Sequence, residues 1–246
     1  MMKALLYLFL VLGLLSCSLQ KNTKEDHQII EVIKTDESPT IDGRGMENSW
    51  NRTEWLLLDQ NWVGGSYEHD DFNGRYKLLW DKEALYILLE VVDDTLYDSH
   101  EDPFKLWWND DSLQLFIDED NSGGLHQYDH NAFAYSIALD GNVVDFDLGK
   151  EPQLYNEHVT SSKITKDKLT TWEIKVRLYQ MDFIKGTEAK SVALSKNKKI
   201  GFALAYCDND GSTERENFIG SVFVPGEDKN VGWINADVFG TLVLRE

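Results

Sequence analysis

Oxygen-bearing side chains alternate along one short acidic segment. Asp118, Asp120 and Ser122 stand at every second position, and Gly123 follows them. Closely spaced oxygen ligands suit a hard cation such as Ca²⁺. The spacing matches the first half of an EF-hand loop, but the twelfth position is Asp129 instead of glutamate, and the flanks have strand patterns. The segment is therefore typical of a solvated acidic turn, and a simple structural calcium loop with Asp118, Asp120 and Ser122 as ligands is the functional alternative. Weaker acidic segments occur at 93–94 and 208–211.

Two of the eight tryptophans stand in polar, loop-like surroundings. Trp108 precedes Asn109-Asp110-Asp111, and Trp233 follows a segment that begins Pro225-Gly226. Binding residues tend to lie on loops that a rigid scaffold holds, so we expect both indoles to point outward. Other tryptophans lie in apolar patterns that favour the core, namely Trp50, Trp80 and Trp172. For Trp62 and Trp107 we favour packing over a place at the rim of a site.

Catalytic signatures are missing from the sequence. It contains no Gly-x-Ser-x-Gly, no His-Glu-x-x-His and no glycine-rich phosphate loop. Cys207 lies in an apolar run without a neighbouring base, which is typical of a buried, inert thiol. His126 and His130 have no cysteine partner at zinc-ligand spacing. We expect a non-enzymatic protein, with glycoside hydrolysis by two of the 43 acidic side chains as an alternative.

The composition excludes several classes of partner. The chain has 246 residues, 24 lysines and arginines, 43 aspartates and glutamates, and a net charge of −19. A chain this acidic does not match the phosphates of nucleic acid or an anionic membrane surface. A hydrophobic fraction of 42% suffices for a sizeable core. Two cysteines exclude a disulfide framework.

The N-terminal segment has the pattern of a secretory signal. A charged start is followed by an apolar run over 4–15, which is too short to cross a bilayer core of about 30 Å. The run ends in Leu14-Leu15-Ser16-Cys17, which resembles the lipobox of bacterial lipoproteins. That resemblance implies cleavage after residue 16 and lipidation of Cys17. We expect a tether over 17–28, membrane contact only through the lipid, and a place in the bacterial cell envelope at the outer membrane. A plain signal peptide is the alternative.

Short alternating segments dominate the remainder of the chain. Strands are expected at 76–80, 85–92, 112–117, 133–139, 142–146, 171–178, 200–206 and 239–244. Charged or Asp-Gly turns between neighbouring segments predict hairpins. A short helix is expected near 46–52 and a turn near 180–184. The pattern predicts one all-β domain over 29–246, an antiparallel β-sandwich of jelly-roll or immunoglobulin-like type with two sheets of about five strands each.

Four segments, in order along the chain, are similar to motifs of a known family. They are Ile41-Asp42-Gly43 with Trp50, Leu79-Trp80-Asp81 with Leu85-Tyr86-Ile87 and Asp93, Trp108 with Asn109-Asp110-Asp111-Ser112-Leu113-Gln114-Leu115-Phe116-Ile117-Asp118, and Trp233 with Phe239-Gly240-Thr241-Leu242-Val243-Leu244. Together they resemble the family 9 carbohydrate-binding modules over nearly the whole chain after the tether. That resemblance implies a β-sandwich, in agreement with the strand pattern, and structural calcium.

The resemblance also implies which residues bind sugar. Trp108 and Trp233 match the two family tryptophans that enclose a sugar ring in a slot. Asn230 matches a family asparagine, whereas Gln114 replaces a family carboxylate and Tyr135 falls at or near a family arginine. Glutamine and tyrosine still form hydrogen bonds, so the slot is expected to persist with a changed sugar preference or affinity.

The expected function is non-catalytic capture of oligosaccharide or polysaccharide chain ends by a monomeric cell-envelope lipoprotein, in support of carbohydrate catabolism. One alternative is a structural or adhesion sandwich with a vestigial slot. Another is a haem-binding module of the related DOMON type, for which Met46 and Met181 are the only methionines outside the signal segment.

Overall fold

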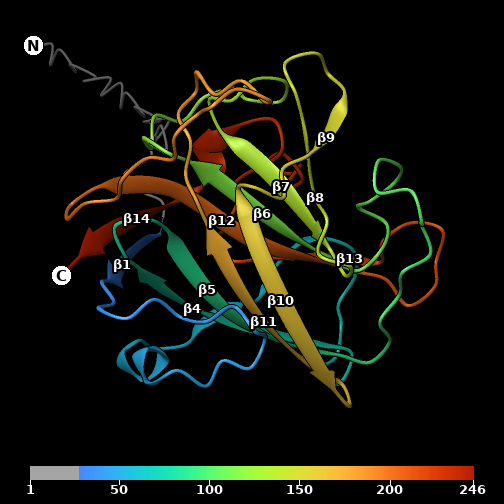
Figure 1. The fold of residues 1–246 in the computed structure, drawn as a ribbon. Coiled ribbons are helices and arrows are strands. Elements are labelled where there is room, and N and C mark those ends of the chain that lie inside the picture. The colour runs from blue at the N-terminus through green and yellow to red at the C-terminus, as the bar shows by residue number, and fades with distance from the viewer. Residues whose placement is uncertain (1–27) are drawn as a thin grey trace, which may run out of the picture.

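The computed structural model describes residues 28–246, which fold into two packed β-sheets (Figure 1). The large sheet has the strand order β1 (Ile29–Ile33), β14 (Gly240–Arg245), β12 (Lys199–Asp208), β6 (Ser112–Asp118), β7 (Phe133–Ala138), β8 (Val143–Phe146) and β9 (Pro152–Leu154), and β13 (Asn217–Gly220) joins β12 to β3 (Gln60–Val63). The small sheet has the order β10 (Val159–Lys166), β11 (Leu169–Val176), β5 (Leu85–Asp93), β4 (Phe72–Trp80) and β2 (Leu56–Leu58).

The predicted β-sandwich is confirmed. Neighbouring strands are antiparallel except for β1 and β14, which run parallel. The hairpins predicted around 81–83 and 140–141 are present as β4–β5 and β7–β8. The helix expected near 46–52 is a 3-10 helix over Asn48–Arg52, and a second one covers Ala236–Val238. The expectation of about five strands in each sheet is wrong for the large sheet, which has nine.

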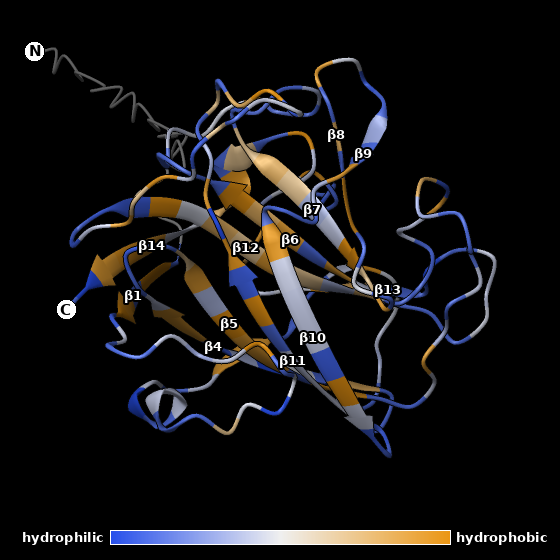
Figure 2. Cartoon of the chain, viewed as in Figure 1, coloured by the Kyte–Doolittle hydropathy of each residue, from blue (hydrophilic) through white to orange (hydrophobic). Residues whose placement is uncertain are grey.

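Alternation along the strands explains how the sandwich buries its core. On β6, Leu113, Leu115 and Ile117 point between the sheets and join the main hydrophobic cluster. Their neighbours Gln114 and Phe116 therefore lie on the outer face of the large sheet. Figure 2 shows the apolar residues concentrated on the strands. Because β6 is buried on both faces, something must cover its outer face.

Two smaller apolar clusters cover the outer faces. On the small sheet, Trp50 packs against Tyr86 and Leu88. On the large sheet, Trp62 packs at 5.1 Å from Phe218, centroid to centroid, and donates from Nε1 to the Val222 carbonyl. The predicted core positions of Trp50, Trp80 and Trp172 are confirmed, since each is at most 2% exposed.

The signal segment 1–16, Cys17 and the tether up to residue 27 lie outside the described residues. Among residues 28–246, no helix has the length and apolar character needed to span a bilayer.

Candidate functional site

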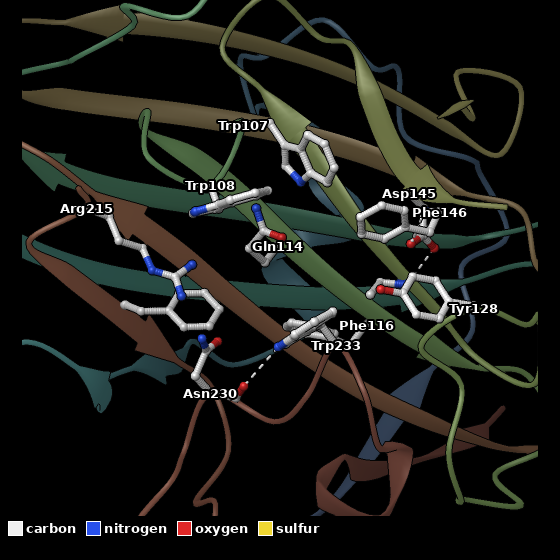
Figure 3. Close-up of a pocket in the computed structure, with 12 residues that line it drawn as sticks. Trp107, Trp108, Gln114, Phe116, Tyr128, Asp145, Phe146, Arg215, Asn230 and Trp233 are labelled. Carbon is white, nitrogen blue, oxygen red and sulfur yellow. Dashed lines mark hydrogen bonds between the residues drawn. The ribbon is translucent and has the colours of Figure 1, made fainter. Parts of the chain in front are cut away.

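A pocket of about 270 Å³ opens on the outer face of the large sheet (Figure 3). Its walls come from β6, β7, β8, β13 and the loops around residues 107, 128, 215 and 230. The lining residues are Trp107, Trp108, Gln114, Phe116, Tyr128, Ala134, Asp145, Phe146, Arg215, Phe218, Asn230 and Trp233. Four of the five residues predicted to bind sugar are therefore brought together in one pocket.

The two predicted tryptophans lie on opposite sides of this pocket, with Gln114 between them in the view of Figure 3. Trp108 is 38% exposed and Trp233 is 36% exposed, so each indole keeps a free surface. Trp107, which also lines the pocket, meets Trp108 edge to face at a centroid distance of 5.0 Å. Trp233 donates from Nε1 to the Asn230 carbonyl at 3.1 Å. Both indoles are thus held in place before any ligand arrives.

His126, which we did not predict as a site residue, fixes the Trp233 loop. Its backbone nitrogen donates to the Ile234 carbonyl at 2.9 Å, and its Nε2 donates to the Gly232 carbonyl at 2.8 Å. The imidazole is buried and packs on Phe239. Burial lowers the pKa of His126, so it acts as a neutral donor. These two bonds bracket Trp233 from both sides.

Gln114 lies on the floor of the pocket because of the strand alternation. Its Nε2 donates to the hydroxyl oxygens of Ser136, at 2.6 Å, and Ser112, at 3.2 Å. These bonds use both amide protons and orient the amide plane. An uncharged group of fixed orientation therefore stands where the resemblance implies a carboxylate.

Tyr135 does not reach the pocket, so its predicted place in the site is wrong. It is 1% exposed and lies in the core between the sheets, where its hydroxyl hydrogen-bonds His158 Nδ1 at 2.6 Å. Register explains the error: Gln114 pairs with Ser136 across β6 and β7, so Ala134 and Ser136 share its face. A shift of one residue along a strand reverses the face of a side chain.

Arg215 brings a guanidinium into the pocket from the loop before β13. Its Cζ lies 4.1 Å from the centroid of the Phe218 ring, and its Nη1 donates to Cys207 Sγ at 3.2 Å. Cys207 is buried, as predicted. Sequence reasoning missed Arg215 because only the pairing of β13 with β12 brings it to this face.

The end of the pocket opposite Arg215 is aromatic (Figure 3). Phe146 lies 5.5 Å from Trp107 and 5.4 Å from Tyr128, centroid to centroid. Beside it, the Asp145 carboxylate accepts from the Ala134 and Phe146 amides at 2.8 Å each. Burial raises the pKa of Asp145 to about 7. Asp145, Phe146 and Tyr128 were not predicted, because only the order of the strands in the sheet brings β8 and the loop around residue 128 to the pocket.

The acidic loop at 118–123 is a turn closed by its own hydrogen bonds. The Asp118 carboxylate accepts from the Gly123 amide at 2.7 Å, and Asp120 accepts from the Ser122 amide at 3.0 Å. The loop follows a strand, as predicted. Calcium binding by Asp118, Asp120 and Ser122 stays a prediction.

Carboxylates from the two weaker acidic segments meet a third carboxylate, from Asp111, which directly precedes β6. Asp93, Asp111 and Asp208 are buried, and one oxygen of each lies within 4.8 Å of the others. Burial and the charge of Asp93 raise the pKa of Asp111 to about 9. Three buried carboxylate oxygens at this spacing are a donor set that fits Ca²⁺. A second group, Asp71, Asp94 and Asp210, is partly exposed.

The methionines considered as haem ligands do not support that alternative. Met46 is 80% exposed and Met181 is 67% exposed. Neither lines the pocket.

Comparison with known proteins extends these observations. Residues 41–246 match the family described as "Carbohydrate family 9 binding domain-like". The chain is 26% identical over 209 residues to endo-1,4-beta-xylanase C of Paenibacillus barcinonensis and 26% identical over 210 residues to endo-1,4-beta-xylanase A of Thermotoga neapolitana. These matches cover 85% and 84% of this chain but 17% of each xylanase.

A solved structure has the same fold. It is a family 9 carbohydrate-binding module from Caldicellulosiruptor kristjanssonii in complex with cellotriose, with a TM-score of 0.65, 21% identity, and coverage of 89% of this chain and 94% of that chain. A second structure of such a module from this organism is in complex with glucose. Because the family match covers residues 41–246, the chain belongs to the carbohydrate family 9 binding domain-like proteins.

Proposed function

We propose that this protein binds the terminal residues of an oligosaccharide in the pocket between Trp108 and Trp233, without catalysing a reaction on it. The observation that carries this proposal is the placement of two partly exposed indoles on opposite sides of one pocket, with the uncharged amide of Gln114 between them and that of Asn230 beside Trp233. The relatives bound to cellotriose and glucose support a sugar ligand. The first candidates are therefore gluco- and xylo-oligosaccharides.

The chemistry of a pyranose ring fits this arrangement. Its two faces carry C–H groups, and each indole offers a flat apolar surface that buries about 150–250 Å². Its rim carries hydroxyls, which cost about 1–3 kcal/mol each when they are desolvated without a hydrogen-bond partner. Gln114 offers its amide oxygen as an acceptor, since both of its amide protons are bound to Ser112 and Ser136. The side chain of Asn230, beside Trp233, can both donate and accept. Together they can satisfy hydroxyls at the rim of a bound ring.

The shape of the pocket favours a chain end over a long internal segment. Its volume of about 270 Å³ is near the lower limit of small-molecule pockets, which run from about 300 to 1,000 Å³. Phe146 and Tyr128 close one end, and Arg215 stands at the other (Figure 3). One or two sugar residues fill such a space.

Structural calcium is part of the proposal. Asp93, Asp111 and Asp208 would hold the ion, which would compensate three buried like charges. The Asp111 carboxylate already accepts from the backbone nitrogens of Tyr97 and Asn209 at 2.7 and 2.9 Å. Since residues 97 and 111 bracket the loop that carries Trp108, an ion here would stiffen one wall of the pocket.

The biological setting proposed from the sequence is a lipid-anchored module of the cell envelope that holds oligosaccharides for partner enzymes. The related xylanases, of which the matched region is a small part, support a role beside glycoside hydrolysis. Replacement of Cys17 by alanine tests the anchor: the variant should leave the membrane fraction and appear in the soluble fraction. Retention of the variant in the membrane fraction would contradict lipidation at Cys17.

Titration calorimetry tests the binding function. The purified full chain is titrated with gluco-, xylo- and manno-oligosaccharides, their monosaccharides and uronic-acid-bearing counterparts, in buffer with calcium. Saturable binding that is lost in Trp233→Ala supports the proposal. Absence of binding for every sugar in the panel contradicts the proposal and favours a structural sandwich with a vestigial slot.

A further inference from the structure

We propose that Arg215 makes the pocket select an oligosaccharide whose bound residue carries a carboxylate, such as a uronic acid. This inference rests on the proposed function and names the class of sugar that the same pocket prefers. It starts from the position of a guanidinium at one end of a pocket that is otherwise lined by aromatic rings, uncharged amides and one buried acid.

The Arg215 guanidinium is fixed but has no acidic partner. It stacks on Phe218 at 4.1 Å and donates to Cys207 Sγ at 3.2 Å. No ion pair among residues 28–246 includes Arg215. The chain has 43 acidic residues and 24 basic ones, yet none of the described carboxylates forms an ion pair with Arg215. The N–H groups of Arg215 that do not contact Cys207 can therefore donate to a ligand.

The polar groups near Arg215 do not repel an anion. Gln114 and Asn230 carry no charge. The family carboxylate that Gln114 replaces would repel an acidic sugar. The one carboxyl group among the lining residues, Asp145, lies at the opposite end of the pocket (Figure 3). Both of its oxygens are occupied by backbone amides. Burial raises the pKa of Asp145 to about 7, which reduces its negative charge below neutral pH.

A carboxylate suits this guanidinium better than a hydroxyl does. Arginine presents a planar fork of donors that can bind both oxygens of one carboxylate. Such charge-assisted bonds are about twice as strong as bonds between neutral groups. Because the pocket is partly shielded from water, this difference in hydrogen-bond strength persists there. An acidic sugar should therefore bind at least tenfold more tightly than its neutral counterpart.

The experiment compares matched sugar pairs. Calorimetry measures Kd for glucuronic acid against glucose and for glucuronosyl-xylotriose against xylotriose, on the full chain at pH 6 and low salt. The expected result is at least a tenfold preference for the acidic member of a pair. Raising the NaCl concentration to 0.5 M should shrink this preference, because salt screens partly exposed charges.

Three variants assign the preference to its cause. Arg215→Gln should reduce the ratio of the two Kd values to near one, and Gln114→Glu should lower it by repelling the acid. Arg75→Gln is the control, because Arg75 pairs with Glu90 on the small sheet and lies outside the pocket. It should leave the ratio unchanged. Melting temperatures show whether each variant is folded.

The outcomes separate this inference from the proposed function. Binding of neutral and acidic sugars with equal affinity, or a preference that Arg215→Gln leaves intact, overturns the selection of acidic sugars while sugar binding stands. Absence of binding for every sugar overturns both.

Discussion

Trp108 and Trp233 lie on opposite sides of the same pocket, although one precedes β6 and the other precedes β14 (Figure 3). Strand order explains the meeting, because β12 pairs with β6 on one side and with β14 on the other. Their indoles are more than a third exposed, whereas the core tryptophans are buried. Exposed indoles that are fixed in place point to a ligand.

Replacement of either indole should abolish binding without unfolding the protein. Trp108→Ala or Trp233→Ala removes one stacking face, and loss of a central aromatic contact typically costs at least about 2 kcal/mol, or about thirtyfold in Kd. The melting temperature should change by only a few degrees, because each side chain is partly exposed. Trp172→Ala, in the core, is the control and should melt far lower. A collapse of the melting temperature in Trp233→Ala would show that this residue is part of the core.

Removal of the floor amide should weaken binding moderately. Gln114→Ala deletes an acceptor for sugar hydroxyls, with an expected loss of about five- to thirtyfold in affinity, or about 1–2 kcal/mol. Ser136→Ala removes only the 2.6 Å partner that orients the amide, so its effect should be smaller. Equal affinity in Gln114→Ala and the unmodified chain would exclude Gln114 from the site.

His126 should position Trp233 without contacting the ligand. His126→Ala removes the Nε2 bond to the Gly232 carbonyl, so the loop should loosen and the affinity should drop about tenfold. His126→Gln, which keeps a donor, should recover part of the loss. The change in tryptophan fluorescence on sugar binding reports the loop directly. A purely structural role would lower the melting temperature and leave both affinity and fluorescence response unchanged.

Removal of calcium should destabilise the protein. If Asp93, Asp111 and Asp208 hold the ion, a chelator should lower the melting temperature by about 5–15 °C, since a tight ligand adds a few kcal/mol to the folded state. Sugar affinity should weaken as well, because the loop that carries Trp108 is tied to Asp111.

The calcium prediction has its own pair of variants. Asp111→Asn should remove the response to chelator, and Asp102→Asn, at an exposed aspartate, should retain it. The calcium prediction fails if the unmodified chain has the same melting temperature in calcium buffer and in chelator.

Acid should destabilise the fold through His158. Burial, followed by the charge of Lys185, lowers the pKa of His158 to about 3, while an unfolded histidine titrates near 6.5. The unfolded chain therefore binds more protons between these values, and stability falls as the pH drops below about 6.5. From pH 7 to pH 5 this one group removes about 2 kcal/mol from the free energy of unfolding.

The matched variant for this pH effect is His158→Gln, which keeps a partner for the Tyr135 hydroxyl. Urea titrations of both proteins at pH 7 and pH 5 give the four free energies needed. The variant should lose less stability between the two pH values, whatever its absolute stability. Identical pH dependence in both proteins would contradict the assignment.

The sequence was most informative where a pattern is local. Alternation of polar and apolar residues along β6 and β11 marks the side of each strand that enters the main core, so these central strands were predicted. β10 was missed, because it is an edge strand that pairs only with β11, and most of its residues are polar and only Val159 is buried. An edge strand needs no continuous apolar face and leaves no alternation to find.

The site was predictable only in part, because it is assembled across the sheet. Trp108 and Trp233 stood out through their polar surroundings. Arg215 and Asp145 gave no signal, since only the neighbouring strands and their register bring them to the pocket. Tyr135 was misplaced for the same reason, by one residue of register.

Sugar binding between the two indoles is tested most directly by calorimetric titration of the full chain, and of its Trp233→Ala variant, with a panel of neutral and acidic oligosaccharides in calcium buffer. A sugar site between Trp108 and Trp233 predicts saturable, one-to-one binding of at least one sugar class to the unmodified chain, and no measurable binding to a variant that is still folded. Unchanged affinity in the variant, or no binding by either protein, would contradict a sugar site between Trp108 and Trp233.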